Sequence, residues 1–208
     1  MTRVLVLAPH PDDEALGCGG ALRLHAQAGD HVAAVWLTSG ELGLPVAVEE
    51  ARAIREAEAR ASAGLLGIGT TVFLRLPDWT VGEDVPGAGE ALGRVLNDVR
   101  PELVYVPHPA EWHPDHAVSL AVLRRAMPAG LQPKVLGYEV WSPLTRHDEV
   151  IDTTTVHTVK LAAARAHASQ HGIYDYARAV EGLSAYRGVM TGRVAYAEVF
   201  ADLTEEAR

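Results

Sequence analysis

Two short runs of histidine and aspartate carry the residue types that bind a metal ion and hydrolyse amides. The first run, HPDD, occupies residues 10–13, and the second, HPDH, occupies residues 113–116. A hydrolytic zinc site takes about three ligands from histidine and carboxylate and leaves one position for water. His10 and Asp13, three residues apart around a stiff proline, can converge on one ion. The third ligand must then come from the second run.

The residues that remain in the two runs suit a catalytic role. Once three ligands are assigned, the carboxylate of Asp12 and one histidine of the second run are left over. An amide hydrolase needs such a pair, because a base must take a proton from water and an acid must steady the oxyanion and protonate the leaving amine. The spacing alone leaves open which of His113 and His116 is the ligand.

Simpler roles compete for some of these residues. Asp115 stands near the start of a predicted helix, where an aspartate most often caps the helix N-terminus. His108 lies five residues before His113 and is a rival ligand, but a hydrogen-bonded loop histidine is the stronger expectation there. The choice of ligands therefore depends on which of these residues the fold brings together.

The segments that must position these residues alternate between strand and helix patterns. The unbroken apolar run at residues 4–8 is typical of a strand buried on both faces. Ligands bind at the carboxyl ends of parallel strands, and both runs follow a predicted strand. The alternation predicts an α/β fold in which residues 1–208 form a single Rossmann-like domain, its mainly parallel sheet flanked by helices on both faces. Further strands are predicted at 31–38, 71–76, 103–106, 135–141 and 194–203, and helices at 15–28, 47–66, 89–99, 115–127, 155–169 and, in part, 173–190.

The composition excludes several other classes of protein. The net charge is −9 over 208 residues, so the surface repels phosphate backbones and nucleic-acid binding is not expected. The single cysteine, Cys18, excludes an intrachain disulfide and a cysteine-rich zinc site, and we expect it to be a packed small residue. No stretch has the length of a membrane span, and the apolar run at residues 4–8 is too short for a secretory signal. We therefore expect a cytoplasmic protein without a membrane partner.

The two runs, with their surroundings, resemble the PIG-L/LmbE-like deacetylase family. The resemblance lies in residues 8–14 (APHPDDE), in the glycine-rich run at residues 17–20 (GCGG) and in the second run, HPDH. Two weaker elements support it, namely residues 167–170 (HASQ), preceded by Lys160, and Arg55 with Glu58. The resemblance implies a zinc-dependent hydrolase that uses zinc-activated water to remove the N-acetyl group from an N-acetylglucosamine-type sugar or glycoconjugate.

The resemblance also implies a role for each site residue. Zinc would be bound by His10, Asp13 and His116, with Asp12 as the general base and His113 as the oxyanion stabiliser and acid. One Zn²⁺ per chain is expected, although the same donors suit another divalent ion such as Fe²⁺. The resemblance further implies a small amino-sugar substrate and a homo-oligomer, a trimer or a hexamer. Arg55 would face the polar or anionic part of the substrate, with a solvated helix face as the alternative.

One position departs from the family pattern. Some relatives have a tyrosine that helps to bind the oxyanion two residues before the second run, where this chain has Glu111. A carboxylate cannot stabilise an oxyanion unless it is protonated. Tyr138, Tyr174 and Tyr176 are therefore candidates to supply the missing hydroxyl.

Three alternative functions are also compatible with the pattern. An amidase for a larger sugar–thiol conjugate would share the metal centre. The other two are a non-catalytic nucleotide-binding module on a doubly wound sheet and a metal-binding protein without catalysis. The run at residues 17–20 fits neither the Gly-x-Gly-x-x-Gly pattern nor a Walker motif, and a nucleotide module would leave the histidines without a role.

Overall fold

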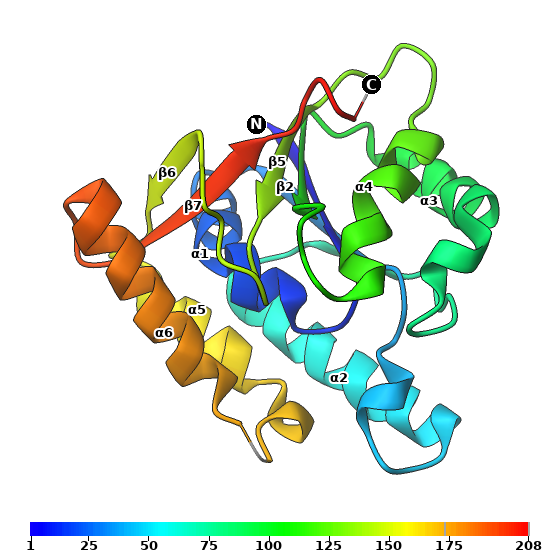
Figure 1. Cartoon of the computed structure of the whole chain (residues 1–208), viewed down its shortest axis with the longest axis horizontal. Helices are drawn as coiled ribbons and strands as arrows, with labels where there is room; N and C mark the ends of the chain where they lie inside the picture. The colour runs from blue at the N-terminus through cyan, green and yellow to red at the C-terminus, as the bar shows by residue number, and fades with distance from the viewer. Residues whose placement is uncertain (173, 208) are drawn as a thin grey trace.

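The computed structural model describes residues 1–172 and 174–207, which form a seven-stranded sheet in the order β3-β2-β1-β4-β5-β7-β6 (Figure 1). The first five strands of this order are parallel, and β7 runs antiparallel to both of its neighbours. The mainly parallel sheet predicted from the sequence is thus confirmed. The strands are β1 (Arg3–Ala8), β2 (His31–Trp36), β3 (Thr70–Phe73), β4 (Leu103–Pro107), β5 (Lys134–Tyr138), β6 (Glu149–Asp152) and β7 (Ala197–Asp202).

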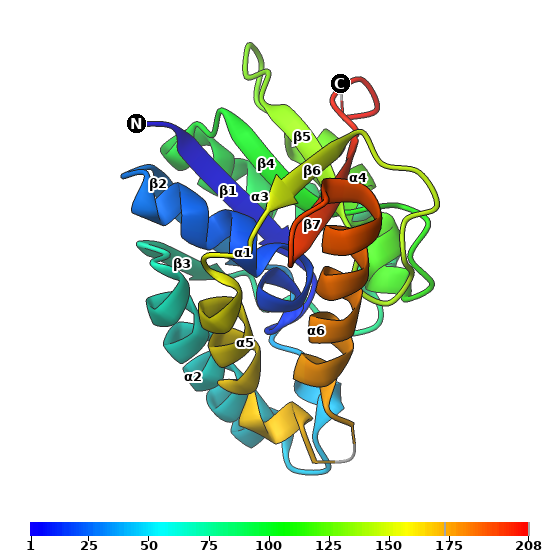
Figure 2. The same cartoon turned by 90° about the vertical axis from the view of Figure 1, so that its left-hand side faces the viewer.

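Helices cover both faces of the sheet (Figure 1; Figure 2). One face packs against α1, α2, α5 and α6, and the other packs against α3 and α4. In β1, Val4 and Val6 point into the first layer, whereas Leu5 and Leu7 point into the second. Burial on both sides explains why this strand is an unbroken apolar run. The helices are α1 (Asp13–Gln27), α2 (Val48–Leu66), α3 (Val85–Val99), α4 (Pro114–Ala126), α5 (His157–Arg165) and α6 (Tyr176–Arg187).

The structure differs from the sequence prediction mainly near the C-terminal end. The helix predicted at 155–169 is shorter and is followed by a 3₁₀ turn over Ala168–Gln170. The helix predicted in part from Ile173 begins at Tyr176, and Ile173 lies outside the described residues. The strand β6 was not predicted, because it pairs only with β7 at the sheet edge and therefore lacks a buried apolar run.

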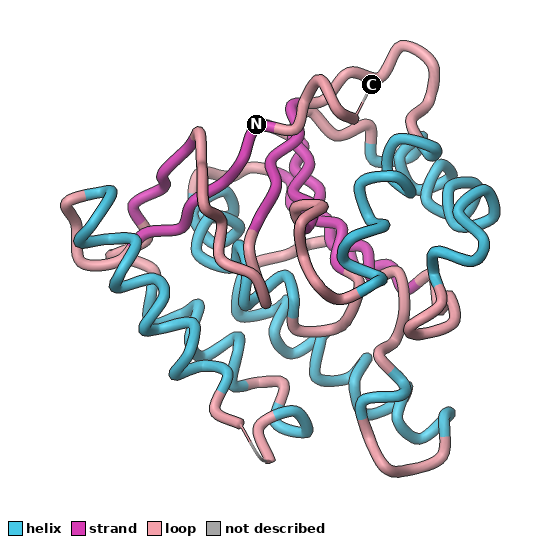
Figure 3. Tube along the Cα trace, in the orientation of Figure 1, coloured by secondary structure: helices cyan, strands magenta, loops and turns pink. Residues whose placement is uncertain are grey.

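The connections of the strands bring the two histidine runs together. From β1 the chain moves to β2 and β3 on one side, and from β4 it moves to β5 on the other side. Adjacent strands whose connections leave in opposite directions form a topological switch point, where ligands bind beyond the carboxyl ends. The first run leads from β1 into the start of α1 and the second forms the start of α4 beyond β4, so both lie at the same edge of the sheet (Figure 3).

The glycine-rich run lies inside α1 and serves packing. The helix is kinked at Cys18, which is fully buried, as expected for a packed small residue. A side chain at position 17 is excluded, because a Cβ on Gly17 would lie 2.3 Å from the Tyr138 ring. The run therefore allows α1 to approach β5 closely, and it does not form a phosphate-binding loop.

A buried ion pair supports this kinked helix from the far side. The Glu198 carboxylate accepts hydrogen bonds from the backbone N–H groups of Gly20 and Ala21, each at 2.8 Å, just beyond the kink. It also pairs with Lys160 Nζ at 2.6 Å, and both side chains are 2% exposed. Lys160 therefore holds α1 in place through Glu198.

Among the described residues, no helix combines the length and the apolar character that crossing a bilayer requires.

Candidate active site

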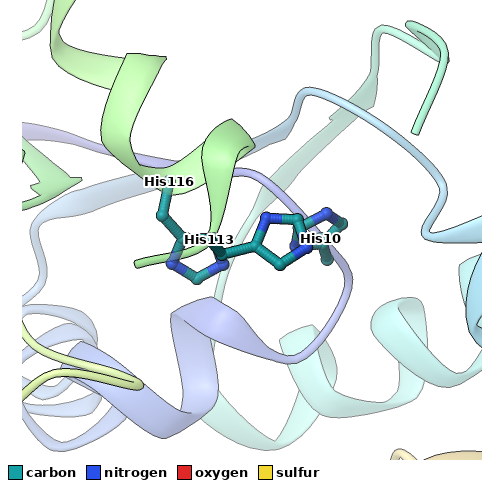
Figure 4. Close-up of side chains that lie close together, drawn as sticks. All are labelled: His10, His113 and His116. Carbon is teal, nitrogen blue, oxygen red and sulfur yellow. The ribbon is translucent and has the colours of Figure 1, made fainter. Parts of the chain in front are cut away.

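Three histidines from the two runs form a cluster at the switch point (Figure 4). The ring centroids of His10 lie 4.6 Å from His113 and 5.3 Å from His116, and those of His113 and His116 are 5.2 Å apart. One ring nitrogen from each of the three lies within 4.8 Å of the others. Asp13 Oδ2 lies 3.3 Å from His10 Nδ1 and 3.1 Å from His116 Nε2. The structure thus brings together all three predicted ligands, with His113 beside them.

The environment of His116 fits a metal ligand. Its side chain is fully buried; among the described residues Nδ1 has no hydrogen-bond partner, and the contact of Nε2 is the Asp13 carboxylate at 3.1 Å. A buried ring nitrogen without a hydrogen bond is destabilising, and an ion shared with the Asp13 carboxylate would satisfy His116. Burial by itself raises the pKa of Asp13, but the imidazoles of His116 and His10 outweigh burial and hold that pKa well below its usual range. Two imidazoles and a carboxylate are donors that zinc accepts.

Two further carboxylates lie behind His10. Its Nε2 atom is 3.0 Å from Asp78 Oδ1 and 3.3 Å from Asp115 Oδ2. Metal-ligating histidines usually donate their second ring nitrogen to a carboxylate, which fixes the orientation of the ring. No local pattern marks Asp78 as part of the site, because its partner His10 is 68 residues away in the chain.

The predicted helix cap at Asp115 is wrong. Its carboxylate accepts hydrogen bonds from the backbone N–H groups of Trp79 at 2.7 Å and Val81 at 3.2 Å, so it is used by the loop that follows β3. The cap of α4 is His113, whose Nδ1 atom accepts from the Asp115 N–H at 3.3 Å. Packing of a distant loop therefore overrides the local preference. Since Nδ1 of His113 is an acceptor, its proton sits on Nε2.

Asp12 is held in a strained backbone conformation next to the cluster. Its φ angle is 122°, a region that non-glycine residues seldom adopt and that is common at functional sites. Its N–H donates to Glu14 Oε2 at 3.2 Å, and its Oδ2 lies 3.0 Å from Arg55 Nη2. Burial raises the pKa of Asp12 to about 6, although the Arg55 guanidinium opposes the shift. A carboxylate with this pKa is suited to exchange protons near neutral pH.

Arg55 is buried within the site, so the solvated helix face is excluded. It is 4% exposed, and its guanidinium donates to the carbonyl oxygens of Gly40 at 3.0 Å and Pro11 at 2.5 Å. Position 40 favours glycine, because its φ angle is 60° and a Cβ there would lie 2.1 Å from Arg55 Nη1 and displace the guanidinium. The guanidinium therefore braces the loop that carries Asp12.

The pKa of His113 is shifted in the opposite direction from that of His10. Burial, assisted by the imidazoles of His10 and His116, lowers the pKa of His113 to about 4. The Trp79 ring packs against it with a centroid distance of 4.3 Å. A neutral His113 still has the Nε2–H group with which to donate a hydrogen bond to an oxyanion.

The cluster opens into a cavity of about 410 Å³, a size within the range of small-molecule sites. Aromatic rings form much of its rim, and Trp79 is 48% exposed while Trp112 is 60% exposed. Such rings offer apolar faces on which a sugar can pack. The lining comprises His10, Asp12, Asp13, Leu16, Gly43, Arg55, Asp78, Trp79, Trp112, His113, Trp141, Gln170 and Tyr176.

Glu111, at the position of the missing tyrosine, has a structural role. Its carboxylate accepts hydrogen bonds from the backbone N–H groups of residues 140–142, at distances of 2.7–3.1 Å. It thereby fastens the loop that presents Trp141 to the cavity.

His108 lies outside the cluster, since its Nε2 is hydrogen-bonded to Ser142 O at 3.0 Å and its Nδ1 accepts from Ala110 N at 3.1 Å.

Of the three candidate tyrosines, Tyr176 is the one that lines the cavity. Tyr138 is fully buried in the core, where its hydroxyl donates to Leu7 O at 2.9 Å. Tyr174 is 65% exposed and lies outside this cavity. Burial, followed by the nearby Asp12 carboxylate, raises the pKa of Tyr176, so its hydroxyl keeps its proton at neutral pH.

The two weaker sequence elements meet behind the site. The Glu58 carboxylate accepts from Ser169 N at 2.8 Å and from Ser169 Oγ at 2.7 Å, which brings Gln170 to the cavity wall. His167 is fully buried, and its Nε2 lies 3.5 Å from Glu14 Oε1. Glu14, which holds the Asp12 N–H, also accepts from Trp36 Nε1 at 2.9 Å. These contacts stabilise the loop that carries the first run.

Comparisons with known proteins agree with the geometry. The family model described as "PIG-L: GlcNAc-PI de-N-acetylase" matches residues 5–127. The chain is 34% identical over 175 residues to the uncharacterized deacetylase YaiS of Escherichia coli K12, covering 80% of this chain and 90% of that protein. It is 32% identical over 190 residues to the diacetylchitobiose deacetylase of Thermococcus kodakarensis, covering 81% and 70% of the two chains.

The fold by itself does not determine the reaction. A solved structure of 4-carboxy-2-hydroxymuconate hydratase from Pseudomonas putida KT2440 matches with a TM-score of 0.80 and 24% identity, covering 97% of this chain and 95% of that one. At this identity the likeness concerns the fold alone. The reaction must therefore be argued from the residues of the site.

Proposed function

Because this chain belongs to the GlcNAc-PI de-N-acetylase (PIG-L) family, we propose that it is a metal-dependent deacetylase that hydrolyses the acetamide of an N-acetylglucosamine-type sugar or glycoconjugate. One observation carries the proposal. The two histidine runs meet so that Asp13 touches both His10 and His116, with Asp12 and His113 on the same cavity wall.

We infer that His10, Asp13 and His116 hold one Zn²⁺ per chain, and Fe²⁺ is the alternative that the same donors accept. When bound, such an ion would act as a Lewis acid and would lower the pKa of a water molecule bound to it to about 7. The carboxylates of Asp78 and Asp115 keep the His10 ring oriented through Nε2. The contribution of the protein is therefore a pre-oriented set of donors.

The remaining side chains of the site would move protons and position the substrate. Arg55 holds Oδ2 of Asp12, which leaves Oδ1 to take a proton from the attacking water. His113 donates its Nε2–H to the carbonyl oxygen as negative charge develops there. That charge raises the pKa of His113, so the ring can take up a second proton from solvent at Nδ1 and then, as the imidazolium, give its Nε2 proton to the leaving amine. Arg55 also lines the cavity and would face the polar part of the sugar.

Metal analysis combined with acetate release tests this proposal. We expect purified protein to hold one metal ion per chain and to release acetate from N-acetylglucosamine glycosides. His116→Asn should lower the metal content well below one per chain, because a buried ligand is lost. His108→Asn is the matched control and should keep the metal, since His108 is bonded to loop backbone outside the cluster. Metal retention in the first variant and loss in the second would contradict the ligand assignment.

Tyr176→Phe should lower kcat by about 10-fold, less than the 10²–10³ expected for a principal oxyanion donor. The reason is that Tyr176 lines the cavity of a chain that has Glu111 in place of the family's oxyanion-binding tyrosine. KM should change little, because the interaction is made in the transition state. Steady-state kinetics of acetate release measure the effect, with Tyr186→Phe, on an exposed tyrosine, as the control. An unchanged kcat would remove Tyr176 from the mechanism.

The other expectations remain predictions. An amidase for a larger sugar–thiol conjugate would use the same residues, and comparing acetyl with bulkier amides distinguishes the two activities. The single domain over residues 1–208, the trimer or hexamer, the cytoplasmic location and the absence of a nucleic-acid partner are likewise predictions. A nucleotide-binding module is disfavoured, since the glycine-rich run lies inside α1.

A further inference from the structure

A second hollow, larger than the catalytic cavity, lies beside it. This groove has a volume of about 850 Å³ and runs along α6 and residues 139–141. It shares Leu16, Trp141 and Tyr176 with the lining of the catalytic cavity. Figure 2 shows α6 alongside α1, the helix whose first turn carries Asp13. A molecule bound at the histidine cluster can therefore extend into the groove.

The surface of this groove is mainly apolar. The apolar part of its lining includes Val140, just after β5, and Ala179, Val180 and Leu183 on α6. Besides Arg178 and the two tyrosines, Tyr174 and Tyr176, few free polar groups are available for the hydroxyls of a further sugar, and burying unpaired hydroxyls is unfavourable. The lining therefore favours an apolar occupant over a second sugar ring.

The two carboxylates of the groove are already engaged. Glu139 is paired with the Arg187 guanidinium at 2.7 and 3.0 Å and accepts from Leu144 N at 2.6 Å. Asp175 caps α6 by accepting from Arg178 N at 3.0 Å. Neither carboxylate needs a ligand to satisfy it.

Aromatic rings lead from the cavity into the groove. The ring centroids of Trp112 and Trp141 are 5.9 Å apart, those of Trp141 and Tyr176 are 5.5 Å apart, and those of Tyr176 and Tyr174 are 6.2 Å apart. Trp141 is 38% exposed and Tyr174 is 65% exposed, so their faces are accessible. Large aromatic faces contribute much of the binding energy for flat or chain-like apolar groups.

We propose that the groove binds an apolar aglycone, so that the substrate is an alkyl or aryl glycoside of an N-acetylated amino sugar. This inference rests on the proposed function. Because that reaction removes only an acetyl group at the histidine cluster, the apolar extension must be carried by the sugar. The amino sugar occupies the catalytic cavity, and its aglycone passes between Trp141 and Tyr176 into the groove.

The test compares acetate release from methyl and octyl 2-acetamido-2-deoxyglucopyranosides, both anomers of each, below the micelle concentration. We expect kcat/KM to be about 10–100-fold higher for the octyl than for the methyl glycoside, since each buried methylene contributes to discrimination. Ala179→Glu, which places a charge on an exposed residue of the groove wall, should reduce this ratio toward one. Tyr186→Glu adds the same charge to the same helix outside the groove and should leave the ratio unchanged.

Three results would overturn the inference. The first is a ratio near one in the wild-type protein. The second is a gain that follows the length of the N-acyl chain and not the aglycone. The third is a change in oligomeric state caused by Ala179→Glu, measured by sedimentation, which would assign the groove to an interface between copies of the chain. Failure to release acetate from either glycoside would instead contradict the proposed function, so the two failures are distinguishable.

Discussion

Asp12→Asn lowers kcat/KM for acetate release by about 10²–10⁴-fold, the usual contribution of a general base, while the metal content stays at the wild-type level. The amide of asparagine has nearly the shape of the carboxyl group but cannot take a proton from water. Asp12 is not one of the three proposed metal ligands, so the ion should remain. Arg55 loses its ion-pair partner but keeps its bonds to the carbonyl oxygens of Gly40 and Pro11.

Kinetics and metal analysis on the same preparation check this prediction. Asp98→Asn is the matched control, because Asp98 is exposed on α3 and should behave as wild type. Loss of activity together with loss of metal would place Asp12 among the ligands. Full activity in Asp12→Asn would refute its assignment as the base.

Lys160→Met lowers the free energy of unfolding by about 3–5 kcal/mol, the range for breaking a buried ion pair by removing one partner. Methionine fills similar space but carries no charge. The Glu198 carboxylate, whose side chain is 2% exposed, then lacks its neutralising cation. Glu198 also holds the N–H groups of Gly20 and Ala21 beyond the kink of α1. The variant should therefore loosen the helix that carries Asp13 in its first turn.

The chain offers a matched control, because Lys134 is its other lysine. Lys134 pairs with Glu149, and these side chains are 47% and 32% exposed. Lys134→Met should change the free energy of unfolding by only about 0.2–1 kcal/mol, as is usual for an exposed pair. Urea denaturation of both variants makes the comparison. Equal effects would mean that burial of the Lys160–Glu198 pair does not matter to stability.

The sequence allowed much of the fold to be predicted, because local patterns are strong where a strand is buried on both faces. The run at residues 4–8 has no polar residue, since helices cover both sides of β1. The end of α2 at residue 66 was also predicted correctly. The next residue is Gly67, whose φ angle of 82° favours glycine. Where burial is partial, as in the edge strand β6, the pattern is too weak to predict the element.

The sequence also identified the residues of the candidate site, but not their contacts. His10 and Asp13 are close in the chain, so their convergence is a local property. Asp78, Asp115 and Arg55 contact the site across separations of 68, 105 and 43 residues, and no local pattern encodes such pairings. For the same reason the cap predicted at Asp115 was wrong, and the burial of Arg55 could not be decided.

By itself, then, the sequence determined the chemical types available: two histidine runs, each placed after a strand by local backbone preferences and hydrophobic pattern. Only the tertiary structure decided that the runs meet, because β1 and β4 become neighbours whose connections leave in opposite directions. It also decided which charges face one another, since the pKa of Asp12 and the orientation of His10 depend on burial and on partners from distant loops. Those effects act through space, and the order of residues along the chain does not record them.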